Sequence, residues 1–257
     1  MNMSHEHPIS VRDISVAYNS TRVLSGISFS VKKGEIFVVM GGSGSGKSTL
    51  MKTMVGLLPP EGGRVFYGAT SFWEADDDLR EDILRRIGIL YQRGALWSSM
   101  TLAENVALPL EEFTGLTPGE IRDIVSFKLA LVGLSGFENS YPSEISGGMM
   151  KRAALARAMA LDPEILFFDE PSAGLDPVSA RLLDELILEL KENLKTTIVV
   201  ITHDLESIFS IADNSIFLDS ALRTMIASGN PKTLLEHSQD IRVRRFLTRG
   251  RIAPQVE

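Results

Sequence analysis

Cysteine is absent from the 257-residue sequence, so the fold does not rest on a disulfide scaffold. A collagen-like chain and a coiled coil are also excluded, because 44% of the residues are hydrophobic and 23% are charged, as in globular proteins. A chain of this length buries about 75% of the surface that it exposes when unfolded. One large core, or a core with a small subdomain, is therefore expected without a disulfide or a structural metal.

Long apolar runs are missing as well. The longest, 36–40 and 198–201, have the length of strands, below the roughly 18 residues that a membrane span needs. Residues 1–8 lack the basic stretch followed by an apolar stretch that marks a secretory signal. We therefore expect a cytoplasmic location and no membrane crossing by the chain itself.

An excess of positive charge is the third feature that the sequence lacks. With 33 acidic and 26 basic side chains the formal net charge is -7, which argues against nucleic-acid binding driven by phosphate neutralisation. The exception is local, because five of the ten residues 242–251 are arginine. This cluster could face lipid headgroups, a partner or water.

Hydrophobic periodicity predicts strands of two kinds. Alternating apolar residues in 9–16 and 27–31 predict two half-buried strands joined by a polar turn, an antiparallel arrangement. The uninterrupted apolar runs 36–40, 165–168 and 197–201 predict strands covered on both faces in a parallel sheet.

Helix-start signals separate these strands. Thr101 and Thr117 each precede a glutamate three residues later, the spacing of a capping box, so the middle of the chain is expected to be mostly helical. Further helices are expected from Gly147 to about 160 and, after Asp176 and a proline, to about 193. With the short strand 87–91, this alternation predicts an α/β core, to which the last twenty or so residues are interpreted as an appendage.

A phosphate-binding loop follows the strand 36–40. The pattern G-x-x-x-x-G-K-[ST] lies between a buried strand and a helix, where backbone N–H groups and the positive helix end can wrap nucleotide phosphates. Lys47 is expected to contact the β- and γ-phosphates, and the Ser48 hydroxyl to bind Mg²⁺. The expected ATP-binding residues here are Gly41, Gly42, Ser43, Gly44, Ser45, Gly46, Lys47, Ser48 and Thr49.

Two carboxylates end the apolar strand 165–168, at the edge where parallel sheets bind ligands. Asp169 suits Mg²⁺, directly or through water, and Glu170, which points elsewhere, suits the general base that polarises an attacking water. A phosphate loop alone leaves kinases, GTPases and many ATPases open. The acidic pair favours nucleotide hydrolysis.

Ser146 and the two glycines that follow it predict a second helix N-terminus able to bind an anion. With this element the sequence resembles the ATP-binding-cassette (ABC) ATPase family over nearly its whole length. Six landmarks stand in the family's order: the phosphate loop, Gln92, Ser146-Gly147-Gly148, Asp169-Glu170, Ala173-Gly174-Leu175-Asp176 and Thr202-His203-Asp204. The resemblance implies an α/β fold, with a P-loop ABC ATPase core of parallel sheet flanked by helices, an N-terminal antiparallel β subdomain and a helical subdomain.

The resemblance also implies roles for single residues. Gln92 senses the γ-phosphate and Mg²⁺, and His203 hydrogen-bonds the γ-phosphate and holds Glu170 and the water in place. Tyr18 stands where the family often stacks an aromatic ring on adenine, and Asp176 touches the opposite subunit. The implied catalytic residues are Lys47, Gln92, Glu170 and His203, the metal ligands Ser48, Gln92 and Asp169, and the further ATP-binding residues Tyr18, Ser146, Gly147, Gly148 and Asp176.

One chain has two anion-binding helix ends but needs only one nucleotide. In the family that it resembles, two cassettes pair head to tail about a two-fold axis, so that residues 146–148 of each cap the ATP on the other's phosphate loop. ATP closes this dimer and hydrolysis releases it. Met149 replaces the glutamine of the commonest family signature and cannot donate a hydrogen bond, but the serine and glycine N–H groups remain, so phosphate binding is expected to survive.

Within the family, segments 92–97, 105–110, 146–149, 152–157 and 242–247 resemble the Mla-type (maintenance of lipid asymmetry) branch. Its members power transport of phospholipids or other hydrophobic substrates. The resemblance implies a peripheral subunit on the cytoplasmic face of the inner membrane. Its implied partners are a second copy of itself, an MlaE-like integral permease, an MCE-domain protein and a small regulatory subunit, with no nucleic acid.

In that interpretation the apolar surface around Leu96 and Trp97 receives a short cytoplasmic helix of the permease. The alternative for Trp97 is ordinary core of the helical subdomain. Two other functions stay open: the ATPase of a small-solute ABC importer would share every nucleotide residue, and a non-transport ABC ATPase of repair or translation usually has a coiled-coil insertion or a second cassette.

The expected domain organisation follows the landmarks. Residues 1–95 and 160–238 form a RecA-like ATP-binding core with the antiparallel β subdomain, 96–159 form the helical subdomain with the signature, and 239–257 form a basic C-terminal tail. The transported substrate, the direction of transport and the role of the tail do not follow from the sequence.

Overall fold

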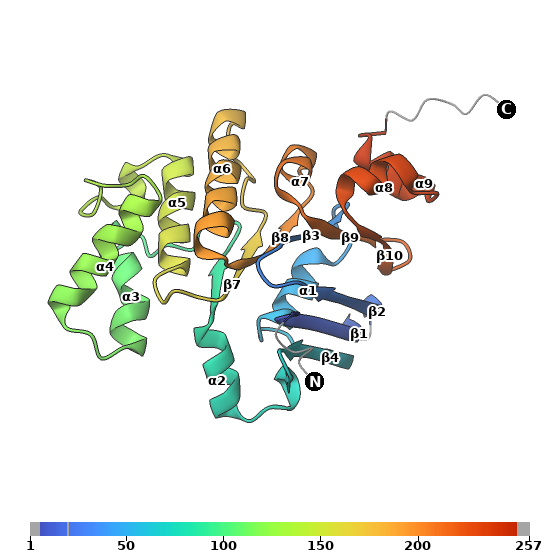
Figure 1. Cartoon of the computed structure of the whole chain (residues 1–257), viewed down its shortest axis with the longest axis horizontal. Helices are drawn as coiled ribbons and strands as arrows, with labels where there is room; N and C mark the ends of the chain where they lie inside the picture. The colour runs from blue at the N-terminus through green and yellow to red at the C-terminus, as the bar shows by residue number, and fades with distance from the viewer. Residues whose placement is uncertain (1–5, 20, 251–257) are drawn as a thin grey trace.

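The computed structural model describes residues 6–19 and 21–250. A small antiparallel sheet lies beside a larger, mostly parallel one, and a lobe of helices projects on the other side, at the left of Figure 1. The two hydrophobic clusters of the chain meet at the large sheet, one on each of its faces.

The small sheet has the strand order β2-β1-β4-β5 and is antiparallel throughout. Its inward residues alternate as predicted, and Ile9, Val11, Ile14 and Val16 are all buried. Strand β4 was not predicted from the sequence, because it begins with Gly62 and Gly63, a residue type that is rare inside strands. The strands are β1 (Ile9–Tyr18), β2 (Thr21–Val31), β4 (Gly62–Tyr67) and β5 (Thr70–Ser71).

The large sheet has the order β10-β9-β3-β8-β7-β6, in which only β10 is antiparallel to its neighbour. Every residue of β3 and β8 is buried, which confirms the prediction of strands covered on both faces. In β3, Val38 and Met40 join one hydrophobic cluster, while Phe37 and Val39 join the other. The strands are β3 (Ile36–Gly41), β6 (Ile87–Leu90), β7 (Ile165–Asp169), β8 (Thr197–Thr202), β9 (Asn214–Asp219) and β10 (Thr224–Gly229).

Helices cover both faces of this sheet. Leu50 and Met54 of α1 pack in the same cluster as Phe37, between the two sheets, whereas Leu183 and Ile187 of α6 pack in the same cluster as the opposite face. Each helix therefore buries one apolar side against β-branched and aromatic residues of the sheet. The elements around the core are α1 (Lys47–Met54), η1 (Phe72–Glu74), α2 (Asp77–Arg85), α6 (Pro177–Leu194) and α7 (Leu205–Ile211).

The helical lobe begins where the sequence predicted helix starts. Thr101 and Thr117 each form a capping box, with Glu104 and Glu120, and Ser146 accepts a hydrogen bond from the backbone of the third helical residue. The core of the lobe is continuous with one face of the large sheet. Its elements are α3 (Leu102–Phe113), α4 (Pro118–Leu131), η2 (Pro142–Glu144) and α5 (Gly147–Ala158).

The C-terminal region forms two helices, α8 (Pro231–His237) and α9 (Ile241–Leu247). Its interpretation as an appendage is wrong for the part that the structure describes: Val243 and Leu247 are buried in the large cluster, and the rings of Phe246 and Phe217 lie 5.1 Å apart. The segment is rich in arginine, but Val243 and Leu247 stand four residues apart and so share one face of α9, which packs against the core. Residues 251–257 of the predicted tail, including Arg251, lie outside the described residues.

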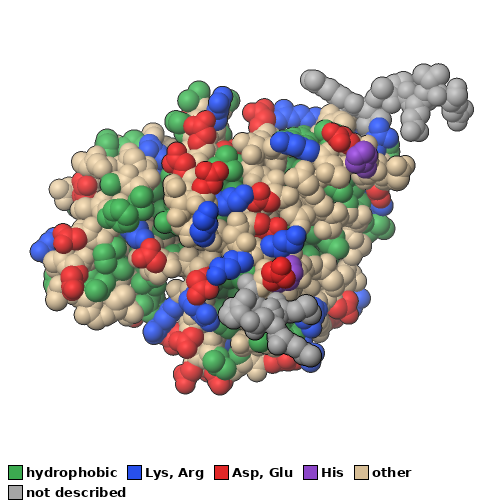
Figure 2. Space-filling model, viewed as in Figure 1, with side chains coloured by type: hydrophobic (Ala, Val, Ile, Leu, Met, Phe, Trp, Pro, Cys, Tyr) green, Lys and Arg blue, Asp and Glu red, His purple; other side chains and the backbone are tan. Residues whose placement is uncertain are grey.

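The surface is of mixed character. On the face seen in Figure 2, acidic and basic side chains are intermixed, and hydrophobic side chains reach the surface over the helical lobe at the left. Within residues 6–19 and 21–250, no helix combines the length and the apolar character that a membrane span requires.

Candidate active site

The phosphate loop joins β3 to α1 at the carboxyl edge of the large sheet. Gly46 has a φ of 93° and precedes α1, and no side chain caps the free N–H groups of the first turn. Ser45 is buried, and its hydroxyl has no hydrogen-bond partner among the described residues. Gly42, Ser43 and Gly44 are exposed. The loop therefore presents unpaired donors around an open turn, a geometry that favours an anion.

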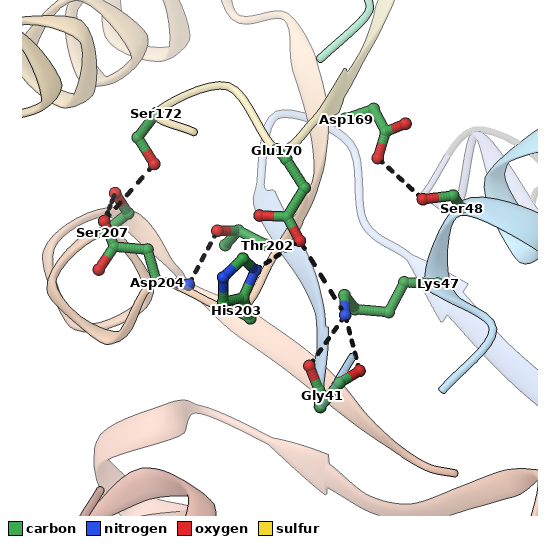
Figure 3. Close-up of polar contacts among 11 residues, drawn as sticks. Gly41, Lys47, Ser48, Asp169, Glu170, Ser172, Thr202, His203, Asp204 and Ser207 are labelled. Carbon is green, nitrogen blue, oxygen red and sulfur yellow. Dashed lines mark hydrogen bonds and ion pairs between the residues drawn. The ribbon is translucent and has the colours of Figure 1, made fainter. Parts of the chain in front are cut away.

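Lys47 reaches back over the loop. Its ammonium donates to the main-chain oxygens of Gly41 at 2.9 Å and Gly42 at 3.0 Å, and it lies 4.0 Å from Oε1 of Glu170 (Figure 3). Burial lowers the pKa of Lys47, while the carboxylates of Glu170 and Asp169 raise it. A buried cation thus stands between the phosphate loop and the acidic pair.

Asp169 ends β7 and Glu170 follows it, and the two side chains point in different directions, as predicted (Figure 3). Asp169 accepts a hydrogen bond of 3.2 Å from the Ser48 hydroxyl, and burial raises the pKa of Asp169 while that hydrogen bond lowers it. Glu170 has a φ of 47°, a strained value for a residue with a side chain, and its N–H donates to Ile201 at 2.7 Å. The turn at Glu170 is what separates the two carboxylates.

The donor set at Ser48 and Asp169 fits Mg²⁺. Both offer hard oxygen atoms, and their 3.2 Å separation is close to the roughly 3 Å between neighbouring ligands in an octahedral shell of radius about 2.1 Å. Among the described residues no group of three or more His, Cys, Asp or Glu side chains forms a metal site of its own. The ion would therefore take its remaining ligands from phosphate oxygens and water.

His203 follows β8 and faces Glu170. Its Nδ1 lies 2.8 Å from Oε1 of Glu170, and its side chain is 63% exposed. The next residue, Asp204, is fixed from three sides: its N–H donates to the Thr202 hydroxyl, and its carboxylate lies 3.5 Å from the hydroxyls of Ser172 and Ser207. These two serines were not singled out from the sequence, where nothing distinguishes them from other serines.

A cleft of about 550 Å³ opens beside Glu170 and His203. Its far wall belongs to α9 and the residues after it, through Arg245, Phe246 and Arg249. The arginine-rich region therefore lies next to the candidate active site. The sequence did not predict this, because more than 40 residues separate these arginines from His203.

The other predicted residues lie on several different elements. Tyr18 ends β1 and is 42% exposed, and Gln92 is exposed two residues after β6, the neighbour of β7. Thr49 is half-buried in the first turn of α1. Asp176 is exposed, and its carboxylate accepts from the backbone of Val178 and Ser179, so it caps α6.

The signature residues 146–148 lie apart from the phosphate loop. Ser146 and Gly147 are exposed at the N-terminus of α5, and no hydrogen bond among residues 6–19 and 21–250 joins 146–148 to the phosphate loop. The Met149 side chain packs against the core of the lobe, while its N–H donates to the Ser146 hydroxyl at 3.2 Å. One chain thus presents two open helix ends that do not complete each other.

Comparison with known proteins agrees with this arrangement. A family described as ABC transporter matches residues 24–173. The intermembrane phospholipid transport system ATP-binding protein MlaF of Haemophilus influenzae is 40% identical over 95% of this chain and 91% of its own length. The probable ribonucleotide transport ATP-binding protein mkl of Mycobacterium tuberculosis is 41% identical over 96% of this chain and 68% of its own length.

A solved structure shows the same fold. A dimeric ATP-binding cassette in a post-hydrolysis state, bound to ADP and Pi, superimposes with a TM-score of 0.78 at 29% identity, over 86% of this chain and 97% of that one. The chain therefore belongs to the ABC transporter family, as one of its ATP-binding and ATP-hydrolysing cassettes.

Proposed function

We propose that this chain is the ATP-hydrolysing subunit of a multi-subunit ABC transporter that moves phospholipids between membranes. The observation that carries the proposal is the convergence of Lys47, Ser48, Asp169, Glu170 and His203 at the carboxyl edge of one sheet. The MlaF relatives support the lipid substrate, because they match over 91% of their own length. The name of the mycobacterial relatives points to ribonucleotides instead, so a soluble-substrate transporter is the competing proposal.

The hydrolytic step follows from the contacts in the pocket. Glu170 accepts a proton from the attacking water or orients it, and His203 holds the Glu170 carboxylate in place from one side. Lys47 offsets negative charge on the phosphates. Ser48 and Asp169, with Gln92 as a further ligand, hold Mg²⁺, which supplies charge neutralisation on the phosphate oxygens when it is bound.

The nucleotide is held by residues of both protomers. In one chain, Tyr18 stacks on adenine and the loop 41–49 wraps the phosphates. In the partner, Ser146, Gly147, Gly148 and Asp176 close over the same nucleotide. The exposure of Ser146 and Gly147, and the separation of 146–148 from the chain's own loop, support this head-to-tail arrangement, and the solved relative is itself dimeric.

Membrane partners complete the transporter. Trp97 is 59% exposed, which favours a docking surface over ordinary lobe core, and the neighbouring Leu96 packs against the lobe. We propose that this surface receives a helix of an MlaE-like permease on the cytoplasmic face of the inner membrane, with an MCE-domain protein and a small regulatory subunit in the same complex. The proposal keeps the three expected units of the chain. These are the ATP-binding core of 1–95 and 160–238, the helical subdomain 96–159 and the C-terminal tail 239–257.

ATP-dependent association of two chains tests the part of the proposal that concerns ATP hydrolysis and dimer formation. Glu170→Gln keeps the shape of the side chain but removes the base, so hydrolysis should fall at least about 100-fold while ATP binding persists. The variant should then elute as a dimer with ATP and as a monomer with ADP. A variant that remains monomeric at saturating ATP contradicts the head-to-tail arrangement.

Purification of the native complex tests the part of the proposal that concerns the membrane partners and the transported substrate. The permease, an MCE-domain protein and bound phospholipid are expected in the purified material, identified by mass spectrometry. A permease accompanied by a soluble-solute binding protein, without lipid, would favour the competing proposal.

A further inference from the structure

The loop that follows Gln92 is attached to α5 through its main-chain oxygens. Lys151 donates from its ammonium to the oxygen of Gln92 and is only 6% exposed. Arg157 donates to the oxygens of Gly94 at 3.0 Å and Ala95 at 2.7 Å. The two basic residues are six positions apart, about 9 Å along the helix axis, so they hold the loop at two separate points.

A third side chain holds the end of the same loop. Asn105 of α3 is fully buried, accepts a hydrogen bond of 2.8 Å from the N–H of Trp97, and donates to the oxygen of Trp97 at 3.1 Å. Segment 92–97 is therefore bonded to two helices of the helical lobe. In contrast, the side chain of Gln92 makes no hydrogen bond within the described residues.

The backbone of the loop needs such support. Gly94 has a φ of 73° and Ala95 a φ of 53°, a left-handed conformation that a residue with a side chain adopts rarely. A Cβ atom on Gly94 would lie 3.3 Å from the Cβ atom of Ala154 on α5, so the loop lies close against the helix. The hydrogen bonds from Arg157 to both carbonyls support this conformation.

Lys151 also lies within electrostatic range of the candidate active site. Burial lowers the pKa of Lys151, and the carboxylates of Asp169 and Glu170 raise it. An ionised donor makes a stronger hydrogen bond to a carbonyl than a neutral one does. Neutral replacement of Lys151 should therefore weaken the attachment of Gln92 more than a charged replacement.

We propose that Lys151 is a positioning residue that makes Gln92 and Ser146 of one chain move as a single body. Ser146 begins α5, the helix that bears Lys151, and Gln92 is fastened to that helix. The inference rests on the proposed function, in which Gln92 lies in the chain's own nucleotide pocket and Ser146 covers the partner's nucleotide. Helix α5 then links the two nucleotide sites of the dimer.

ATPase cooperativity of the full chain tests this link, with Lys151→Met, Lys151→Arg and Arg152→Met. Lys151→Met should lower kcat about tenfold and the Hill coefficient toward one, with KM within about twofold. Lys151→Arg should restore both values. Arg152 is the matched control, because it donates to the oxygens of Val132 at 2.8 Å and Gly133 at 3.2 Å, inside the lobe and away from the loop.

A double-mutant cycle separates positioning from general destabilisation. If Lys151 acts through Gln92, Lys151→Met should cause no further loss of kcat in a Gln92→Ala background. The inference would be overturned if the kcat losses of Lys151→Met and Gln92→Ala multiplied in the double variant. It would also be overturned if Arg152→Met lowered kcat as much as Lys151→Met does while lowering Tm by the same amount.

Amide hydrogen exchange without nucleotide gives a readout that does not depend on activity. Exchange in 92–97 should be at least about tenfold faster in Lys151→Met than in wild type, and unchanged in Arg152→Met. Unchanged exchange in both variants refutes the attachment even if ATP hydrolysis is normal. Absence of ATP binding by the wild-type chain would instead refute the proposed function, while the exchange result still decides the attachment.

Discussion

Glu170 is held by contacts from three residues, Ile201, His203 and Lys47. Its own backbone is bonded to β8, its carboxylate lies 2.8 Å from His203 and 4.0 Å from Lys47, and its side chain is largely buried. A carboxylate constrained in this way loses little freedom when it orients a water. The constraint on the base, and not only its presence, is therefore expected to set the rate.

Replacement of His203 tests that expectation. His203→Ala should lower kcat about 100-fold or more, because the Glu170 carboxylate is still present but loses its lateral support. ATP binding, measured by titration calorimetry, should change by no more than about threefold. His237→Ala is the control, since this exposed histidine lies on α8 and pairs with Glu236. Equal activity of the two variants would exclude the supporting role.

The candidate site was largely predictable residue by residue, for a local reason. The phosphate loop is one run of consecutive residues and the acidic pair is another, so each pattern can be recognised in the sequence without knowledge of the fold. Lys151 and Arg157 left no such signal, because they act on carbonyl oxygens of residues about 60 positions away, and any residue has a carbonyl oxygen.

A buried acid, Asp184 of α6, lies where α6 packs against α7 and takes no part in the proposed hydrolytic step. Burial raises the pKa of Asp184 to about 6, a hydrogen bond from Ser207 lowers it, and the charge of Asp204 raises it again. Oδ1 of Asp184 has no hydrogen-bond partner among the described residues. The ionised carboxylate is therefore an unfavourable feature of the folded state.

The effect of Asp184 on stability should depend on pH. Its folded pKa lies above the ordinary value of 3.8, so the protonated side chain favours folding below about pH 4, and this contribution is lost as pH rises through 6. The full loss is about 3 kcal/mol. Asp184→Asn should remove this pH dependence and raise the free energy of unfolding near pH 7.5, measured by urea denaturation. The exposed neighbour Glu185→Gln serves as control, and a steeper pH dependence in Asp184→Asn would contradict the argument.

Helix α9 is integral to the core although three arginines, Arg242, Arg244 and Arg245, surround Val243 in the sequence. Val243→Asp should lower the free energy of unfolding by about 3 to 5 kcal/mol, because it buries an unpaired charge. Ile241→Asp on the same helix is the control, since Ile241 is 59% exposed and should change stability by less than about 1 kcal/mol. Equal Tm values for the two variants would mean that α9 detaches in solution.

In the proposed head-to-tail dimer, the whole molecule presents two half-sites that a second copy completes. Lys47→Ala inactivates the phosphate loop and Ser146→Arg the signature, so each variant alone should lack ATPase activity. In a head-to-tail dimer of one of each, one nucleotide site has both defects and the other has none. Mixing the purified variants should therefore restore a measurable fraction of wild-type activity. A mixture as inactive as its components would exclude composite sites, provided that cross-linking shows mixed dimers.

Short-range patterns in the sequence were sufficient for the strand types, the capping boxes and the location of the phosphate loop and the acidic pair, because hydrophobic period, caps and phosphate loops depend on neighbours within about one turn of chain. They were insufficient for β4, for the burial of α9, for the arginines beside His203 and for the attachment of 92–97 to α5. Each of these depends on which distant surface covers a segment. That choice is made by packing in the folded chain, where apolar side chains on both faces of the large sheet draw remote segments together.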